Sequence, residues 1–216
     1  VLYFLVALVV YTSSELLEPS SVPAAEILSN TFLLSLVFIL VCILAFNRLA
    51  RQIRLARVRD IDNRVGILIN RLSIFSLVVF AVDIYGFKLY SLFGDTLFFV
   101  RFPTVKAILF LSLFLFHLVV IWAAAYRIQK DFFPGQVTRK QFILSNVSFS
   151  LPALLPWFII SVMSDLLGLF SWQPLKTVMA SPAGEIGYIA FFLAAISVFG
   201  PLLIRKLWNC KPLEQG

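Results

Sequence analysis

Residues 105–126 read VKAILFLSLFLFHLVVIWAAAY, and this stretch decides the fold class of the chain. Lys106 is its one charged side chain, and His117, near the middle, carries its one imidazole. A helix needs about 20 predominantly apolar residues to cross the hydrocarbon core of a bilayer. The stretch therefore predicts a transmembrane helix.

The whole chain shares this character. Of its 216 residues 61% are hydrophobic and 13% are charged, and the mean hydropathy is +0.96. A soluble domain is about 45–50% apolar and about 25% charged, so one soluble core would not bury this much apolar surface. The composition excludes a soluble enzyme, a disordered tail and a stand-alone nucleic-acid-binding module, and it indicates an integral membrane protein.

Five further apolar runs surround this stretch, and they are continuous rather than alternating, which favours helices over the strands of a β-barrel. We predict an all-α, polytopic transmembrane bundle that forms one domain over residues 1–216. The first run is too short to span a bilayer, so we expect it to be the end of a truncated span in a fragment of a longer protein. The expected spans are residues 1–11, 27–46, 65–85, 105–126, 151–170 and 187–204.

Charge predicts the orientation of these spans. Fourteen of the 18 Lys and Arg residues fall in or beside the segments 47–64 and 127–150, or after the last span. Alternating spans place these three segments on the same side of the membrane, and Lys and Arg concentrate in cytoplasmic loops. We therefore expect two basic cytoplasmic loops, at 47–64 and 127–150, and cytoplasmic N and C termini.

A row of arginines follows the second expected span. We interpret it as a topology determinant that continues this span, and the alternative is a basic cytoplasmic surface for anionic lipid headgroups or a protein partner. Each basic residue near an anionic surface contributes about 1 kcal/mol to binding. Nucleic acid is not an expected partner, because the row lacks aromatic side chains for stacking on bases. The row comprises Arg48, Arg51, Arg54, Arg57 and Arg59.

Ionisable residues inside spans are candidates for function, and here they are Asp83, His117 and Asp165. Counted from the cytoplasmic ends of their spans, Asp83 and His117 come to similar depths, so a hydrogen bond between them is feasible. We favour a structural pair, which stabilises a helix contact by about 1–2 kcal/mol. The alternative is a proton relay. The sequence contains no HExxH, no GxSxG and no glycine-rich phosphate loop, so it indicates no catalytic residue, no metal ligand set and no cofactor in this chain.

Three motifs in the C-terminal third are LPALLPW at residues 151–157, SPAGE at 181–185 and LWNCKPLEQG at 207–216. With these motifs the chain resembles the N-terminal transmembrane region of bacterial membrane-bound zinc metallopeptidases of the CAAX prenyl endopeptidase and HtpX family. The residues that carry the resemblance are Pro152, Pro156, Trp157, Trp208, Pro212 and Gly216.

The resemblance implies a function that this chain does not perform alone. In that family such a tail leads into a cytosolic protease domain with the HExxH zinc site, so the resemblance implies a hydrolase whose catalytic domain follows Gly216. This chain would be its membrane-anchoring and orienting domain, with zinc in the missing domain. The substrates would be membrane-associated proteins or peptides, and the location a bacterial inner membrane.

Two alternatives remain open. The first is a small membrane transporter or channel that uses Asp83, His117 and Asp165. The second is a structural subunit of a membrane complex that binds its partner through the arginine-rich face from Arg48 to Arg71.

Overall fold

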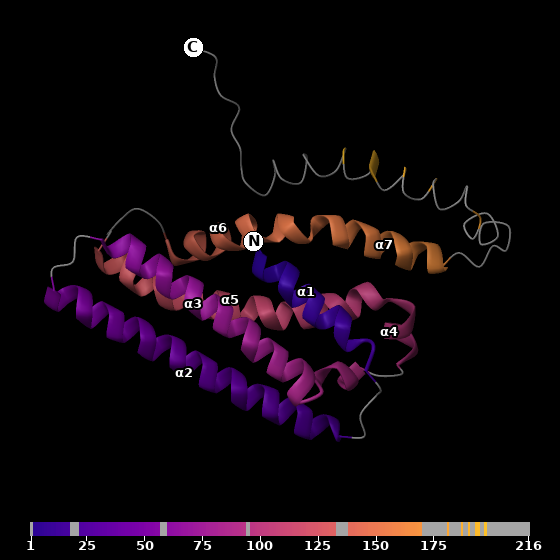
Figure 1. Ribbon diagram of the computed structural model, residues 1–216, viewed down its shortest axis with the longest axis horizontal. Coiled ribbons are helices and arrows are strands. Elements are labelled where there is room, and N and C mark those ends of the chain that lie inside the picture. Colours follow the sequence, from indigo (N-terminus) through magenta and orange to yellow (C-terminus); the bar gives the residue numbers. More distant parts are fainter. Residues whose placement is uncertain are drawn as a thin grey trace, which may run out of the picture.

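The computed structural model of the chain describes residues 2–17, 22–56, 60–93, 96–132 and 138–169, with the isolated residues 181, 187, 190, 193, 194 and 197. All regular elements in these ranges are helical, and the ranges contain no strand. The predicted all-α bundle is confirmed (Figure 1). Its elements are α1 (Leu2–Ser14), α2 (Ala24–Ala56), α3 (Ile61–Ala81), the π-helical turn η1 (Val82–Gly86), the 3-10 turn η2 (Leu89–Phe93), α4 (Leu97–Arg101), α5 (Pro103–Phe132), α6 (Arg139–Ser150), the 3-10 turn η3 (Leu151–Leu154) and α7 (Leu155–Leu169).

Helix α5 is the centre of the bundle and contacts α1, α2, α3, α6 and α7. Its buried side chains recur every three or four positions, the spacing that places them along neighbouring faces of one helix. Phe114 is fully buried, and its ring packs against the rings of Phe4 on α1 and Phe80 on α3. The stretch that predicted the fold class is therefore also the core of the fold.

Four helical segments are long and apolar enough to cross a membrane: Ala24–Leu55, Ile61–Gly86, Pro103–Phe132 and Arg139–Leu166. They contain the spans expected at 27–46, 65–85 and 105–126 and most of the one expected at 151–170. Helix α1 has 13 residues and is shorter than a span. The span expected at 187–204 lies, apart from isolated residues, outside the described part of the chain.

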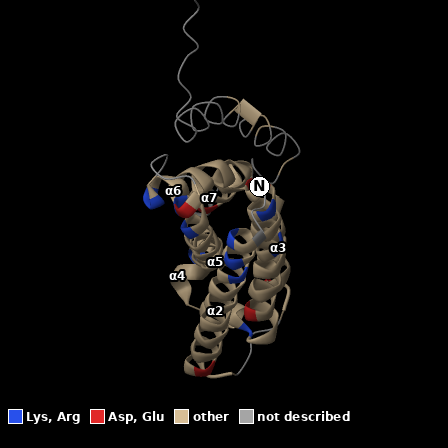
Figure 2. Cartoon of the chain, turned by 90° about the vertical axis from the view of Figure 1, so that its left-hand side faces the viewer, with Lys and Arg blue, Asp and Glu red and all other residues tan. Residues whose placement is uncertain are grey.

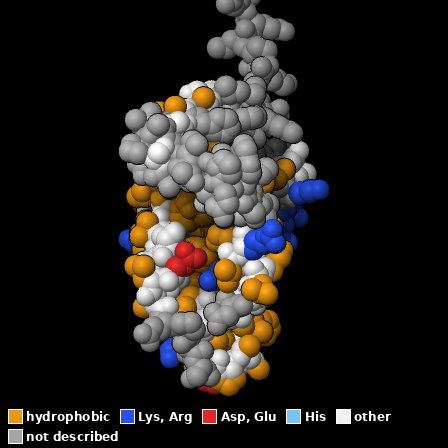
Figure 3. Space-filling model, turned by 90° about the vertical axis from the view of Figure 1, so that its right-hand side faces the viewer, with side chains coloured by type: hydrophobic (Ala, Val, Ile, Leu, Met, Phe, Trp, Pro, Cys, Tyr) orange, Lys and Arg blue, Asp and Glu red, His pale blue; other side chains and the backbone are white. Residues whose placement is uncertain are grey.

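The outward-facing surface of these helices is apolar, as the core is. On α2, Leu33, Leu40 and Leu44 are each more than half exposed. Figure 3 looks onto the end of the bundle opposite the arginine row and shows hydrophobic side chains there together with several charged groups. Apolar residues on both the inner and the outer faces are typical of helices that lie in lipid, and the protein has the character of an integral membrane protein.

The two basic segments expected to be loops are largely helical. Helix α2 continues past Arg48, Arg51 and Arg54 to Ala56, and α6 begins at Arg139. Arg, Leu, Ala and Gln are good helix formers, so the row extends the preceding helix. At α6 the Thr138 side chain and the Gln141 side chain form a capping box, which satisfies backbone N–H groups of the first turn.

The fifth expected span begins earlier than residue 151 and is interrupted. The 3-10 turn η3 separates α6 from α7 at the sequence LPALLP. Pro152 and Pro156 each lack a backbone N–H, and a proline ring clashes with the carbonyl one turn earlier. The two prolines explain why a regular α-helix does not run from Arg139 to Leu169.

Candidate functional site

Asp83 lies in the π-helical turn η1, at the end of α3 away from the arginine row. Its side chain is completely buried, and neither carboxyl oxygen has a hydrogen-bond partner. Thr31 on α2 faces this carboxyl, but its geometry does not make a hydrogen bond, and its hydroxyl is also without a partner. Short π-helical segments within α-helices often occur at functional sites, and an unpaired buried carboxyl is costly to maintain.

His117 lies near the middle of α5 and is completely buried. Its Nε2 atom is 3.2 Å from the hydroxyl oxygen of Ser35 on α2. The ring of Phe38 packs against the imidazole with a centroid distance of 4.8 Å. The Nδ1 atom has no hydrogen-bond partner, so the imidazole retains one unused polar atom inside the bundle.

The hydrogen bond considered between Asp83 and His117 does not form. The imidazole of His117 is hydrogen-bonded to Ser35 instead, and the Asp83 oxygens have no hydrogen-bond partner. Thr31 and Ser35 are four residues apart on α2, so they lie on the same helix face one turn from each other. Helix α2 therefore presents one hydroxyl to Asp83 and the next to His117.

Asp165 on α7 is separate from these two groups. One of its carboxylate oxygens accepts a hydrogen bond from the backbone N–H of Thr104, with an N to O distance of 3.2 Å. Thr104 is the second residue of α5, and the first N–H groups of a helix have no partner within the helix. A carboxylate is also favourable at the positive end of a helix dipole. Asp165 therefore acts as a cap that joins α7 to the start of α5.

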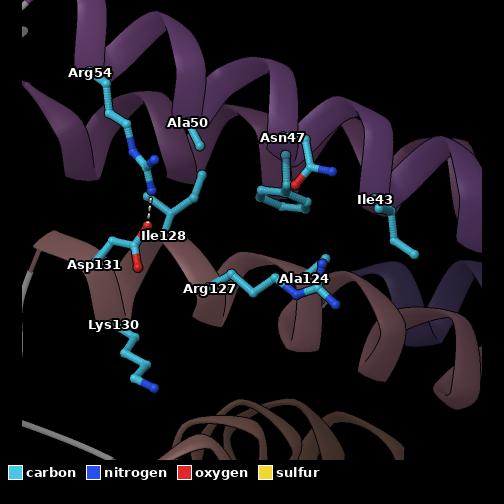
Figure 4. A pocket seen from close by; sticks show the side chains of 10 residues that line it. Ile43, Asn47, Ala50, Arg54, Ala124, Arg127, Ile128, Lys130 and Asp131 are labelled. Atoms are coloured by element: carbon cyan, nitrogen blue, oxygen red, sulfur yellow. Dashed lines mark hydrogen bonds and ion pairs between the residues drawn. The ribbon is translucent and has the colours of Figure 1, made fainter.

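A cavity of about 350 Å³ lies between α2 and α5, near the end where the arginine row is found. Figure 4 shows Arg54 and Asp131 joined across it as an ion pair, with Arg127 and Lys130 from α5 close by. Three cations and one carboxylate line this cavity, so its surroundings favour a polar or anionic molecule. The ion pair also shows that the C-terminal ends of α2 and α5 meet at the same end of the bundle, as alternating spans require.

The arginine row does not form one surface. Arg54 faces α5, whereas Arg48 lines a groove shared with α3. Six residues separate the two, and on a helix with about 3.6 residues per turn they point in directions about 120° apart. Arg51 is exposed, and Arg57 and Arg59 lie outside the described residues. Figure 2 looks onto this end of the bundle and shows Lys and Arg on several helices.

The residues of the peptidase resemblance divide between described and undescribed parts. Pro152 lies in η3, Pro156 is the second residue of α7, and Trp157 is half-buried against the core. Trp208, Pro212 and Gly216 lie outside the described residues.

Sequence reasoning missed the polar residues that surround the candidate site, namely Thr31, Ser35 and Thr104. Thr31 and Ser35 have a recognisable signal, because two hydroxyl residues at i and i+4 in an apolar helix share one face. Thr104 stands at the start of a helix, where no pattern distinguishes it from an ordinary first-turn residue. Its hydroxyl is buried without a hydrogen-bond partner.

Within the described ranges, no group of three His, Cys, Asp or Glu side chains is placed to hold a metal ion. The described residues therefore offer an unpaired carboxyl and an imidazole in an apolar interior, but no zinc ligand set. Comparisons of the chain with family models, with curated proteins and with solved structures gave no match.

Proposed function

We propose that this chain is the membrane-anchoring and orienting domain of a zinc metallopeptidase, in which the HExxH domain follows Gly216. The observation that carries this proposal is the sequence LWNCKPLEQG at residues 207–216, which comes directly after an expected span. The charge pattern supports it, because Arg205, Lys206 and Lys211 favour a cytoplasmic position for this tail. The host membrane in this proposal is a bacterial inner membrane, which the chain crosses several times.

The physical role of such a unit is to confine the peptidase to the membrane surface. A short tether to the membrane raises the effective concentration of the enzyme around its membrane-bound substrate. It also restricts cleavage to bonds close to the bilayer. Zinc would be held by residues beyond Gly216, and its chemistry would be to polarise the scissile carbonyl and activate water.

The test is the intact mass and zinc content of the protein purified in detergent from its native gene. We expect a mass well above 24.4 kDa and about one zinc per chain. The purified protein should cleave a lipid-anchored reporter peptide faster than the same peptide without its anchor. A zinc-free product that ends near Gly216 would remove the proposal.

A second candidate function is a small transporter or channel, and the buried polar groups favour it. Asp83 is fully buried with two unpaired oxygens, and His117 keeps an unpaired Nδ1 atom. Buried ionisable groups in membrane helices often mark ion or proton pathways. Asp165, the third residue of this hypothesis, is already used in capping α5.

Proton uptake into proteoliposomes tests this second candidate. A transporter predicts that His117→Leu and Asp83→Leu abolish uptake while expression and the amount of folded protein that is purified are unchanged. Phe116→Leu is a matched control, because Phe116 neighbours His117 but is exposed. Absence of proton uptake by the unaltered protein would argue against this candidate.

A further inference from the structure

A groove of about 450 Å³ runs between the C-terminal part of α2 and the N-terminal part of α3. Three arginines line it, Arg48 from α2 and Arg64 and Arg71 from α3. Gln52 adds an amide, and Leu49 and Leu68 are among its apolar lining residues. Positive charge from two helices thus converges on a groove whose walls are partly hydrocarbon.

Among the described residues, none neutralises the positive charge in this groove through an ion pair. None of the three arginines takes part in an ion pair or a side-chain hydrogen bond within the described structure. The ion pair of Arg54 lies on the α5 side of α2 and belongs to a different cavity. The three guanidinium groups are exposed and available to an external anion.

The groove lies where the apolar surface of the bundle ends. The uninterrupted apolar run of α2 stops at Phe46, and Arg48 is the first charged residue after it. Arg71 lines the groove together with Ala45, so it lies about level with the end of that run. Exposed Leu44, Ile67 and Ile74 continue the apolar surface from the groove along the helices. Long cationic side chains at such a boundary extend toward the headgroup region of the bilayer.

We propose that this groove binds the phosphate of an anionic phospholipid from the leaflet at this end of the bundle. Guanidinium groups bind phosphate oxygens with paired hydrogen bonds, and Arg48, Arg64 and Arg71 supply three of them around one groove. The acyl chains lie along the apolar surface that begins at Leu49 and Leu68. A free phosphate ion would leave those apolar walls uncovered, and therefore the lipid is the occupant. This inference does not depend on the peptidase proposal.

The experiment is native mass spectrometry of the full chain in detergent, titrated with dioleoylphosphatidylglycerol or dioleoylphosphatidylcholine. We expect retention of phosphatidylglycerol in preference to phosphatidylcholine. The single variants Arg48→Gln, Arg64→Gln and Arg71→Gln should each weaken phosphatidylglycerol binding about fivefold, and the triple variant on the order of 100-fold. Inorganic phosphate added at millimolar concentration should not displace the lipid.

The matched control is the triple variant Arg51→Gln, Arg139→Gln and Lys140→Gln, which removes the same charge from positions outside the groove. It should retain phosphatidylglycerol as the unaltered protein does. An equal loss in the two triple variants would show attraction by net charge alone and overturn the site. Equal retention of the two lipids, or displacement by inorganic phosphate, would also overturn it. If the groove triple variant does not fold, the single Arg64→Gln variant decides, since this exposed side chain forms no ion pair or hydrogen bond with another helix in the described part of the chain.

Discussion

The hydroxyl oxygen of Ser35 on α2 lies 3.2 Å from the Nε2 atom of His117 on α5, inside the bundle. The hydrogen bonds of Tyr3 with Asn70 and of Ser13 with Tyr85 also join separate helical elements, but they are at exposed positions. A buried polar group in a membrane protein has no water to replace a lost partner. The Ser35–His117 contact is therefore a point at which the packing of α2 on α5 is specific rather than only apolar.

Ser35→Ala should destabilise the protein by about 0.5–2 kcal/mol, the range measured for hydrogen bonds between membrane helices. The change leaves Nε2 of His117 without a partner while removing little volume. Thermal unfolding in detergent measures the effect. Ser29→Ala is the matched control, because Ser29 is exposed on the same helix and bonds only to the carbonyl of Glu26. Equal destabilisation by both substitutions would contradict the prediction.

Asp83 and Asp165 should respond in opposite directions to the same substitution. Asp83→Leu removes a buried carboxyl that has no hydrogen bonds. An unpaired buried polar group costs about 1–3 kcal/mol of stability, so the melting temperature of this variant should rise. Asp165→Leu removes the carboxylate that bonds the Thr104 N–H, and loss of a cap costs about 0.5–2 kcal/mol, so its melting temperature should fall. Melting temperatures that shift in the same direction for both variants would show that the two environments are not as described.

The Arg54–Asp131 ion pair should contribute little to stability. Its side chains are 66% and 45% exposed, and exposed pairs are typically worth less than about 1 kcal/mol. Arg54→Gln should therefore lower the free energy of unfolding by less than about 1 kcal/mol. High salt should reduce even this difference, because salt screens exposed charges. The charge-exchanged double variant, Arg54→Asp with Asp131→Arg, should recover most of the loss. A loss several times larger would mean that the pair is shielded from water.

Leu16 and Leu55 test the orientation of the bundle, since they are exposed to almost the same extent, 87% and 86%. Leu16 follows α1, and Leu55 lies in the last turn of α2, beside the arginine row. In a version with Cys42→Ala and Cys210→Ser, we introduce Leu16→Cys or Leu55→Cys singly. A membrane-impermeant maleimide should label the Leu16→Cys variant in intact cells, and the Leu55→Cys variant only after permeabilisation, because basic segments stay cytoplasmic. The reverse labelling pattern would invert the orientation.

The all-α fold class and the positions of the helices were predictable, because both depend on local composition. The stretch 105–126 is continuously apolar over the length of a span, and the structure places it at the centre of the bundle. The helical ends were predicted less well. The arginine row and the residues from Arg139 onward were expected in loops, but charged residues with good helix propensity extend a helix beyond its apolar part.

The candidate site was predictable only in part. Ionisable residues in apolar runs identified Asp83, His117 and Asp165, yet their hydrogen-bond partners are Ser35 for His117, the Thr104 N–H for Asp165, and none for Asp83. Counting residues from the cytoplasmic ends of the spans placed Asp83 and His117 at similar depths. This count does not give the rotation of each helix about its axis, and that rotation decides which side chains meet.

The sequence by itself determined that this protein is an all-α membrane bundle with basic segments that meet at one end, since composition and charge act locally along the chain. Only the tertiary structure decided that Arg54 pairs with Asp131 whereas Arg48 joins Arg64 and Arg71 around a groove. The physical reason is that residues of one row point in different directions around a helix. The neighbouring helices then decide which partner each residue meets. Helix packing determines these neighbours, and the order of residues along the sequence does not specify them.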